Sequence, residues 1–250
     1  MLVLESISIR FGGLLAVDKL SVKSEEGKIT AIIGPNGAGK TTAFNIISGV
    51  YTPMEGTIFF DDEKITGLKP HEVMCKGIAR TYQNIHLFNN MTVLENVLVG
   101  MHTKSRYGIF SNIVRGPSQR QDEKELKEKS LQALEFVGLE NHAQSMAKNL
   151  PYGDQKKLEI ARAIASSPKV LLLDEPVAGM NTKEKEDVMG LVRRIKEGGT
   201  TILLVEHDMK VVMGLADHIY VMNYGKCIAD GMPAQIQKNP IVIEAYLGGE

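Results

Sequence analysis

Residues 34–42, Gly-Pro-Asn-Gly-Ala-Gly-Lys-Thr-Thr, constrain this chain more than any other stretch. They follow the apolar run 29–33 and lead into a second apolar run, which predicts a glycine-rich turn between a buried strand and a helix. The pattern G-x-x-x-x-G-K followed by Ser or Thr is typical, in that setting, of a phosphate-binding loop. Gly34, Gly37 and Gly39 let backbone N–H groups approach a polyanion without a Cβ clash, and the helix start adds a favourable dipole.

Two side chains of this phosphate loop, residues 34–42, carry the chemistry that a nucleotide needs. Lys40 can reach the β- and γ-phosphates, and the Thr41 hydroxyl can ligate Mg²⁺. The alternative is a glycine turn with a chance lysine, and the complete pattern between strand and helix argues against it. The predicted nucleotide site also includes the remaining loop residues Pro35, Asn36, Ala38 and Thr42.

Length and composition limit the remaining choices. A chain of 250 residues can form one large domain, or one domain with a sizeable insertion. A formal net charge of −1 gives no electrostatic reason to expect nucleic acid as a partner. The apolar content of 43% and the charged content of 24% are typical of an ordinary soluble globular protein with a substantial core.

The two cysteines and the N-terminus concern the compartment. Cys75 and Cys227 cannot build a disulfide framework and have no His or Cys at metal spacing, which favours structural roles in a reducing compartment. The N-terminus lacks the charged and long apolar regions of a signal peptide. No apolar run approaches the ~18 residues needed to span a bilayer, so any membrane association is expected to run through a partner.

The N-terminal residues 2–33 predict an antiparallel β region, because apolar and polar residues alternate and the pattern breaks at 12–13 and 25–27. Phe11 ends the first predicted strand, where an aromatic ring could stack on an adenine. The alternative for Phe11 is an ordinary aromatic on a sheet face, which is the commoner fate of a single aromatic residue.

Polar side chains follow predicted parallel strands. Gln83 ends the predicted strand 78–83, and Asp174 and Glu175 end the apolar strand 169–175. A strand parallel to the one before the phosphate loop would deliver its last residues to the nucleotide side of the sheet. There Asp174 can hold Mg²⁺, and Glu175 can orient or deprotonate an attacking water.

His207 is the third polar group placed at such a strand end, directly after the predicted strand 200–205 and Glu206. A single histidine in this position is usually structural. Beside a phosphate loop it can donate to a γ-phosphate or position the water.

Residues 84–164 change character and predict an inserted helical subdomain. Residues 92–95 form a capping box that opens a helix through 101, and 118–137 form an amphipathic helix that Gly138 ends. Gly153, with Asp154 next to it, opens a third helix whose free N–H groups can bind an anion, although most helix starts bind only water. The apolar stretch 107–114 either folds back onto these helices or contacts a partner.

The C-terminal part returns to the α/β pattern. Asn181 and Glu184 cap a helix whose buried stripe is expected to consist of Val188, Leu191, Val192 and Ile195. A hairpin follows over 219–229, and helical stretches lie near 233–238 and 241–247.

The predicted fold is α/β, a phosphate-loop NTPase core with a mostly parallel sheet, an N-terminal antiparallel β subdomain and an inserted helical subdomain. It forms one domain over 1–250, in which 1–83 and 165–232 are the catalytic core, 84–164 is the helical subdomain and 233–250 is a helical tail.

The order of these features resembles the nucleotide-binding domain of an ABC transporter over essentially all 250 residues. The features are Phe11, the loop 34–42, Gln83, residues 150–154, Asp174-Glu175, Met180-Asn181 and His207. Within that family, several stretches are similar to the ATP-binding subunits of branched-chain amino acid importers. These stretches are 10–17, 80–83, 86–93, 206–213 and 244–248.

The resemblance implies a site for ATP and Mg²⁺. Phe11 would stack on the adenine and Lys40 would grip the β- and γ-phosphates. Thr41 and Gln83 would ligate Mg²⁺, with Asp174 joining them directly or through water.

The resemblance also implies a mechanism. Glu175 would be the general base and His207 the γ-phosphate contact. Gln83 would report the nucleotide state to membrane subunits that dock on the helical insertion.

One family motif is altered. The family sequence Leu-Ser-Gly-Gly-Gln is Leu-Pro-Tyr-Gly-Asp here, so Pro151 replaces the Ser whose hydroxyl would contact the γ-phosphate of the opposing subunit. Tyr152 replaces the first Gly and Asp154 replaces the Gln, whereas Gly153 keeps its backbone N–H for donation across a dimer. Losing one hydrogen bond to a charged group is worth about 1.5–3 kcal/mol. Asn181 likewise replaces an Asp and can still cap its helix as a neutral acceptor.

The resulting hypothesis is the ATP-hydrolysing subunit of a membrane importer for branched-chain amino acids. Expected partners are a second ATP-binding subunit, identical or related, the transmembrane permease subunits and, indirectly, a substrate-binding protein, with no nucleic acid. The expected location is the cytoplasmic face of the cell's inner membrane, as a peripheral protein without a span of its own.

Three alternatives stay open. The first is an ABC motor for another cargo, such as urea, other amino acids or exported lipopolysaccharide. The second is a soluble ABC ATPase acting on DNA or ribosomes, which the single phosphate loop and the lack of a long coiled-coil insertion disfavour. The third is a nucleotide-binding module without turnover.

Overall fold

The computed structural model describes residues 1–101 and 117–247. The chain divides into two compact units. The first, here called the core unit, consists of Met1–Arg80 and Lys169–Glu250, and the second, the helical unit, of Thr81–Pro168. Gln83, expected at the end of the core segment 1–83, therefore belongs to the helical unit.

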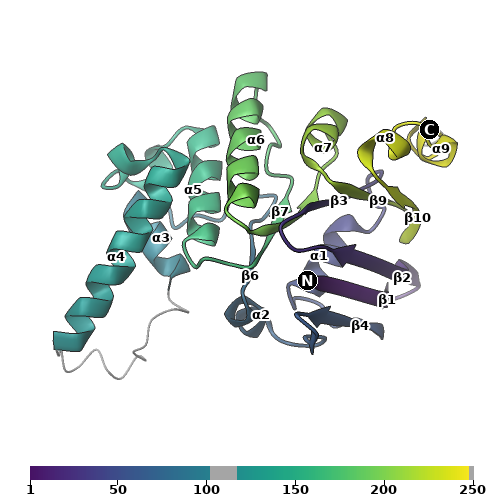
Figure 1. The fold of residues 1–250 in the computed structure, drawn as a ribbon, viewed down its shortest axis with the longest axis horizontal. Coiled ribbons are helices and arrows are strands. Elements are labelled where there is room, and N and C mark those ends of the chain that lie inside the picture. The colour runs from purple at the N-terminus through teal and green to yellow at the C-terminus, as the bar shows by residue number, and fades with distance from the viewer. Residues whose placement is uncertain (102–116, 248–250) are drawn as a thin grey trace. The chain divides into compact units, whose positions relative to one another are not determined.

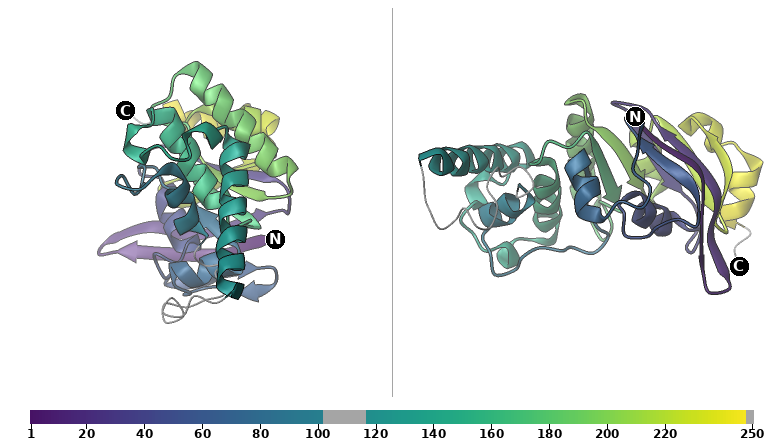
Figure 2. Two further views of the ribbon diagram at one scale, coloured as in Figure 1. Left: turned by 90° about the vertical axis from the view of Figure 1, so that its left-hand side faces the viewer. Right: turned by 90° about the horizontal axis from the view of Figure 1, so that it is seen from below.

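The core unit contains two sheets (Figure 1). The smaller is antiparallel, in the order β2-β1-β4-β5. Its strands are β1 (Leu2–Phe11), β2 (Leu14–Ser24), β4 (Glu55–Phe60) and β5 (Glu63–Lys64). Figure 2 shows β1 and β2 as a long hairpin, in purple.

The alternation in β1 changes phase within the strand. Leu2 and Leu4 are buried, and after a register shift Ile7 and Ile9 are buried instead of the next residues in phase. Ser6, with φ 49°, lies at that irregularity. A bulge at this point keeps both apolar pairs in the core, because one extra residue reverses the face that each later side chain occupies.

The larger sheet has the order β10-β9-β3-β8-β7-β6 and is mostly parallel. Its strands are β3 (Ile29–Ile33), β6 (Ile78–Arg80), β7 (Val170–Asp174), β8 (Thr201–Val205), β9 (His218–Asn223) and β10 (Lys226–Gly231). Every residue of β3, β7 and β8 is buried, as the unbroken apolar runs predicted. Among the described strands of this sheet, only β10 runs antiparallel to its neighbour, so the expected α/β class with a mostly parallel sheet is confirmed.

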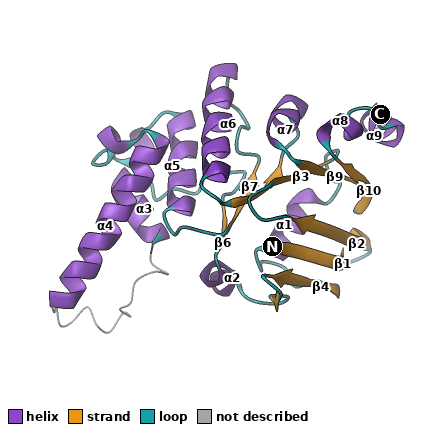
Figure 3. Cartoon of the chain, viewed as in Figure 1, coloured by secondary structure: helices purple, strands orange, loops and turns teal. Residues whose placement is uncertain are grey.

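Helices cover both faces of the larger sheet in the core unit (Figure 3). α1 (Lys40–Ile47) lies between the two sheets, where Phe44 and Ile47 share one apolar cluster with Leu20 of β2 and Leu203 of β8. The other helices of this unit are α2 (Pro70–Lys76), α6 (Thr182–Glu197), α7 (Met209–Leu215), α8 (Pro233–Ile236) and α9 (Pro240–Leu247).

Two features of the core unit differ from the sequence prediction. The strand expected over 78–83 ends at Arg80, because beyond that residue the chain leaves the sheet and its backbone groups bond to side chains of the helical unit. α7 was not predicted. Its signals were present, since Asp208 caps it and Val211, Val212 and Leu215 are buried on one side.

The helical unit contains α3 (Val93–Gly100), α4 (Pro117–Val137) and α5 (Tyr152–Ile164), which contact one another pairwise. Short 3₁₀ turns cover Glu140–His142 and Ala147–Asn149. The predicted capping box is confirmed, since the Thr92 hydroxyl accepts from the Glu95 N–H at 3.1 Å and the Thr92 N–H donates to the Glu95 carboxylate at 2.7 Å. The stretch 107–114, whose role was left open, lies outside the described residues.

None of the helices in the described part of the chain is both long enough and apolar enough to cross a membrane.

Candidate nucleotide site

The phosphate loop connects the buried strand β3 to α1, as predicted. Gly34 has φ 148°, and a Cβ there would lie 2.0 Å from the carbonyl oxygen of Met222. Gly39 has φ 101°, and a Cβ there would lie 2.4 Å from the carbonyl oxygen of Ala16. Neither position can take a side chain, so the loop shape depends on glycine at both.

The first turn of α1 offers N–H groups to a ligand. Its N-cap residue, Gly39, has no side chain to cap these groups, and the first turn contains no acidic residue. Thr41 is exposed and Thr42 is half-buried in this turn. A helix start of this kind is suited to a phosphate.

Lys40 lies folded into the loop. Its Nζ donates to the carbonyl oxygens of Gly34 at 2.7 Å and Pro35 at 2.9 Å. Burial lowers the pKa of the Lys40 ammonium, an effect that the nearby carboxylates of Glu175 and Asp174 oppose. The cation is therefore held inside the loop that is expected to receive phosphates.

Asp174, at the end of β7, is almost completely buried and pairs with Arg80 of β6. Its Oδ2 lies 2.8 Å from Nη2 of Arg80. Arg80 also donates to Asn45 at 2.7 Å and Ser48 at 2.8 Å, both in or next to α1. A role for Arg80 could not be predicted from the sequence, because an arginine at the end of a short strand gives no local signal of a buried partner.

The second carboxylate oxygen of Asp174, Oδ1, is a possible ligand for a cation. Oδ1 is buried and has no hydrogen-bond partner among the described residues. A buried carboxylate oxygen is costly unless it has a partner, and oxygen ligands are those that Mg²⁺ prefers. Asp174 and the exposed Thr41 hydroxyl therefore suit a hard cation on the core unit.

Glu175 and His207 lie together at the ends of neighbouring strands. Nδ1 of His207 is 3.5 Å from Oε2 of Glu175. The Glu175 backbone has φ 47°, and its N–H donates to the Val205 carbonyl at 2.9 Å, which ties the end of β7 to β8. The His207 side chain is 57% exposed and the Glu175 side chain 16%, so both can be reached from solvent. The core unit thus brings Lys40, Asp174, Glu175 and His207 to one end of the sheet.

Glu206 was missed by sequence analysis, although it is completely buried beside this group. Its Oε1 accepts from the Val177 N–H at 3.3 Å, and its Oε2 accepts from the N–H groups of His207 at 3.0 Å and Asp208 at 3.2 Å. Burial raises the pKa of the Glu206 carboxyl, against the effect of these N–H groups. Glu206 therefore fixes the backbone of His207 relative to the loop that follows Glu175. Its only sequence signal was an acidic residue directly after a fully apolar strand.

The C-terminal elements pack against the phosphate loop, a contact that was not predicted from the sequence. The Gly225 N–H donates to the Ala38 carbonyl at 3.0 Å, and the Gly34 N–H interacts with the Tyr246 hydroxyl of α9. Burial raises the pKa of Tyr246. A cavity of about 570 Å³ lies between the loop, the β9–β10 turn and α9.

Phe11 ends β1 with 43% of its surface exposed. Its ring packs edge to face on Tyr51, with 5.1 Å between the ring centroids. The exposed ring is available for stacking, and the proposed contact with adenine stays a prediction.

The remaining predicted residues, Gln83, Gly153 and Asp154, belong to the helical unit. Gln83 is exposed, Gly153 is buried in the first turn of α5, and Asp154 pairs with Lys157 at 3.1 Å. Their place at a nucleotide stays a prediction.

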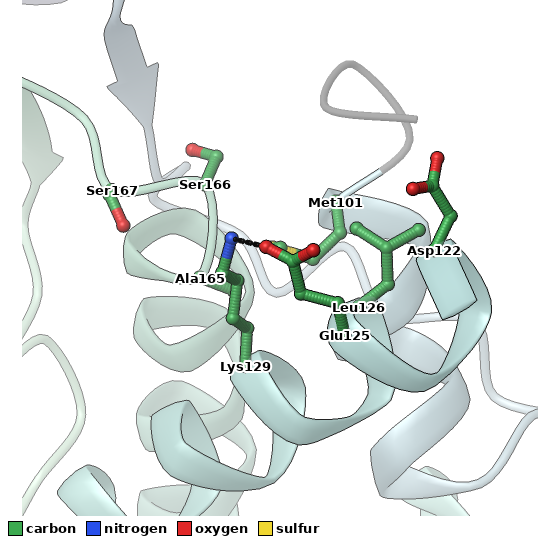
Figure 4. A pocket seen from close by; sticks show the side chains of 8 residues that line it. All are labelled: Met101, Asp122, Glu125, Leu126, Lys129, Ala165, Ser166 and Ser167. Atoms are coloured by element: carbon green, nitrogen blue, oxygen red, sulfur yellow. Dashed lines mark hydrogen bonds and ion pairs between the residues drawn. The ribbon is translucent and has the colours of Figure 1, made fainter. Parts of the chain in front are cut away.

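A smaller cavity in the helical unit, about 270 Å³, contains none of the predicted site residues (Figure 4). Its wall includes the ion pair between Glu125 and Lys129 of α4, 2.6 Å apart, and Ser166 and Ser167 beyond α5. Both partners of this pair are about half exposed.

The fold and the site together define a phosphate-loop nucleotide-binding protein. A family model described as ABC transporter matches residues 17–178, and the chain is 46% identical over 249 residues to the high-affinity branched-chain amino acid transport ATP-binding protein LivG of Escherichia coli (strain K12). That alignment covers 99% of this chain and 98% of LivG. The chain therefore belongs to the ABC transporter family, and the resemblance stated from the sequence is confirmed.

Further similarities refine this result. A second family model, described as branched-chain amino acid ATP-binding cassette transporter, matches residues 226–250. The structure is similar to the ADP conformation of an ATP-binding cassette of an ABC transporter, with a TM-score of 0.87, 34% identity and coverage of 100% and 99% of the two chains. It is also similar to a dimeric cassette in a post-hydrolysis state bound to ADP and phosphate, with a TM-score of 0.77, 26% identity and coverage of 93% and 99%.

Proposed function

We propose that this chain is the ATP-hydrolysing subunit of an importer for branched-chain amino acids. The observation that carries the proposal is the meeting of Lys40, Asp174, Glu175 and His207 beside a glycine-dependent phosphate loop. These groups supply a cation for phosphates, an oxygen ligand for a metal, a carboxylate base and an imidazole, which is the set that nucleotide hydrolysis uses.

Nucleotide binding would begin with an exchange at Lys40. Its Nζ now bonds to two loop carbonyls, and it would turn to the β- and γ-phosphates as the N–H groups of the loop and of the first turn of α1 receive the rest of the charge. Phe11 would hold the adenine. We infer that Thr41, Asp174 and Gln83 would hold Mg²⁺, whose chemistry is to neutralise charge on the phosphates.

Hydrolysis would depend on Glu175 and His207. The Glu175 carboxylate would take a proton from the attacking water, and the His207 imidazole, 3.5 Å away, would contact the γ-phosphate and restrict where that water lies. Glu206 would keep His207 in place through its bonds to the backbone.

The active form is proposed to be a dimer, either of two copies or of this chain with a related one. Each ATP would lie between one phosphate loop and the turn 150–154 of the other subunit, here called the signature turn. A solved relative in a post-hydrolysis state, bound to ADP and phosphate, is described as dimeric, which supports the proposed dimer. Closure on ATP and reopening after hydrolysis would drive alternating access in the membrane partners.

The relatives support the proposed cargo. LivG is named as a branched-chain amino acid transport ATP-binding protein, and the description of the family model that matches 226–250 also names branched-chain amino acids. We infer a peripheral position on the cytoplasmic face of the inner membrane, with permease subunits as direct partners and a substrate-binding protein as an indirect one. Mg²⁺ is the proposed metal.

Glu175→Gln tests the ATPase assignment. The variant should bind ATP with unchanged affinity, lose roughly 100-fold or more in hydrolysis rate because a general base contributes about 10²–10⁴, and accumulate as an ATP-bound dimer. Calorimetry, phosphate release and size-exclusion chromatography measure the three quantities. Glu186→Gln, an exposed carboxylate on α6, is the matched control. An unchanged hydrolysis rate in Glu175→Gln removes Glu175 from its role.

The cargo is tested by identifying the membrane subunits that co-purify with the chain. The full chain, tagged and recovered from membranes, should bring with it permease subunits that, reconstituted with their binding protein, take up leucine, isoleucine or valine on ATP hydrolysis. Uptake of urea or export of lipopolysaccharide by the recovered complex would retain the motor and reject the cargo.

A further inference from the structure

Three charged side chains lie at intervals of three residues along α5: Lys156, Glu159 and Arg162. Residues with this spacing share one face of a helix. The Lys156 side chain is 2% exposed and that of Glu159 1%, which is unusual for charged residues. This face is turned to residues 82–88 of the same unit, here called the Gln83 segment.

The charged groups bond to the backbone of the Gln83 segment. Nζ of Lys156 donates to the carbonyl oxygens of Tyr82 at 3.0 Å and Gln83 at 2.7 Å. Oε1 of Glu159 accepts from the Tyr82 N–H at 3.3 Å, and the carboxylate also accepts from the His86 N–H. Lys156 and Glu159 are 3.5 Å apart, so each compensates the charge of the other.

Two further residues, Arg162 and Asn96, also bond to the backbone of the Gln83 segment. Nη1 of Arg162 donates to the His86 carbonyl at 2.6 Å. At the far end of the segment, the buried Asn96 of α3 accepts from the Phe88 N–H at 2.9 Å and donates to the Phe88 carbonyl at 3.1 Å. The segment has left the sheet, and side chains of the helical unit supply the hydrogen bonds that a strand neighbour would otherwise give.

A buried ion pair is a poor way to gain stability, since desolvation offsets most of the attraction. The pair instead gives the Gln83 segment a defined conformation. The Lys156 ammonium can donate three hydrogen bonds, the Glu159 carboxylate can accept several, and both point at peptide groups of the segment. Apolar side chains of similar size would fill the space without fixing where the Gln83 side chain projects.

We propose that Lys156 and Glu159 are positioning residues that fix the Gln83 segment to α5, so that Gln83 and the signature turn at the start of α5 move as one body. The inference rests on the proposed function, in which Gln83 reaches the nucleotide of its own subunit and the signature turn reaches that of the partner. Occupancy of one site is then transmitted to the other through α5, which makes hydrolysis cooperative in ATP.

The test compares Lys156→Met, which removes the donor, with Lys156→Arg, which keeps a cation with several donors. Lys129→Met is the matched control, because Lys129 forms an exposed ion pair with Glu125 on α4. Among the described residues, it forms no ion pair with the Gln83 segment. Each full-length variant is assayed for ATP affinity, for hydrolysis against ATP concentration and for amide hydrogen exchange.

For Lys156→Met we expect ATP affinity within about twofold of the parent, a turnover number roughly tenfold or more lower, and a Hill coefficient that falls from near ~2 to ~1. Amides of 82–86 should exchange about tenfold faster or more, because their bonds open locally. Lys156→Arg should restore the Hill coefficient, and Lys129→Met should match the parent. A general loss of folded protein would lower turnover without changing cooperativity or selectively exposing 82–86.

A parent-like Hill coefficient and parent-like exchange in Lys156→Met overturn the inference. If that variant does not fold, Glu159→Gln decides in its place, since it keeps an acceptor oxygen but loses the charge that balances Lys156, and the same two readouts must change. A parent chain that fails to hydrolyse ATP counts against the proposed function itself. If the parent and Lys156→Met are equally cooperative, the result counts only against the positioning role of Lys156 and Glu159.

Discussion

At the scale of single residues, the site combines groups with local signals and groups without them. Lys40, Glu175 and His207 could be picked out from the sequence because each follows a buried strand within a few residues. Glu206 also follows such a strand, but its role and that of Arg80 depend on partners distant along the chain: Arg80 pairs with Asp174, and Glu206 accepts from the Val177 N–H. Local patterns indicate which side chains line the candidate site, and tertiary contacts show which residues hold them in place.

Lys40→Ala is predicted to abolish ATP binding measured by calorimetry. The substitution removes the only side-chain cation that the described contacts place inside the phosphate loop, and it also frees the carbonyls of Gly34 and Pro35. Charge-assisted bonds are worth about 1.5–3 kcal/mol each, so loss of two or more weakens binding by roughly 100-fold or more. Lys183→Ala, an exposed lysine on α6, should bind like the parent. Binding of comparable strength by both variants would reject this role for Lys40.

At the scale of elements, most helices were predictable, including the short α8 and α9, whereas α7 was not. α6 has two signals: Asn181 caps it, and its four buried residues are those that the sequence predicted. α7 has only 7 residues, and its cap, Asp208, directly follows Glu206 and His207. These residues were therefore interpreted as part of the site and not as the start of a helix. The strand predicted to reach Gln83 is shorter in the structure, because the backbone of Tyr82 bonds to side chains of α5 and not to the sheet.

The cap of α6 yields a stability prediction. The Asn181 carboxamide oxygen accepts from the Glu184 N–H at 3.0 Å, and the Glu184 carboxylate accepts from the Asn181 N–H at 3.0 Å. Asn181→Ala should lower the free energy of unfolding by about 1 kcal/mol, as loss of an N-cap does. Asn181→Asp should keep or slightly raise it, because a negative charge suits a helix start. Urea denaturation measures both, and an unaltered midpoint for the Ala variant contradicts the prediction.

The joint between α6 and α7 yields a pH prediction. The hydrogen bond from Lys185, 2.6 Å long, holds the pKa of the Asp208 carboxyl below its ordinary value. A carboxyl with a lowered pKa in the folded state stabilises the fold fully above its unfolded pKa and loses that effect as the pH falls through the folded one.

Asp208→Asn keeps an oxygen for the cap and removes the charge. The difference in unfolding free energy between the parent and this variant should be constant above pH ~5 and shrink as the pH drops below ~3.9, the ordinary aspartate value. Denaturation curves across this range measure it. A difference that widens on acidification would show that the sign is wrong.

At the scale of the whole molecule, the expected mixture of a mostly parallel sheet and an antiparallel one was readable from strand character, because buried parallel strands are apolar throughout and half-exposed ones alternate. The packing of the C-terminal hairpin and α9 against the phosphate loop was not. It depends on the sheet order, in which β3 lies between β8 and β9, and no local pattern encodes that order.

This order predicts the effect of shortening the chain. A protein ending at residue 217 lacks β9 and β10, leaves one edge of β3 unpaired and removes the Met222 and Gly225 backbone from the phosphate loop. It should fail to bind ATP and should aggregate through the exposed strand. A protein ending at residue 231 keeps the hairpin and should remain soluble, with weaker binding. Nucleotide binding by the shorter form would contradict this account.

The position of β3 also matters for how a cell makes the protein. The phosphate loop is synthesised before the whole helical unit, whereas both neighbours of its strand, β8 and β9, are synthesised after that unit. Until β8 and β9 have been made, the nascent chain contains the apolar strand β3 without its two neighbours in the sheet, and contacts between distant segments form slowly. We therefore expect the phosphate loop to reach its folded shape, and to bind a nucleotide, only after β8 and β9 have been synthesised.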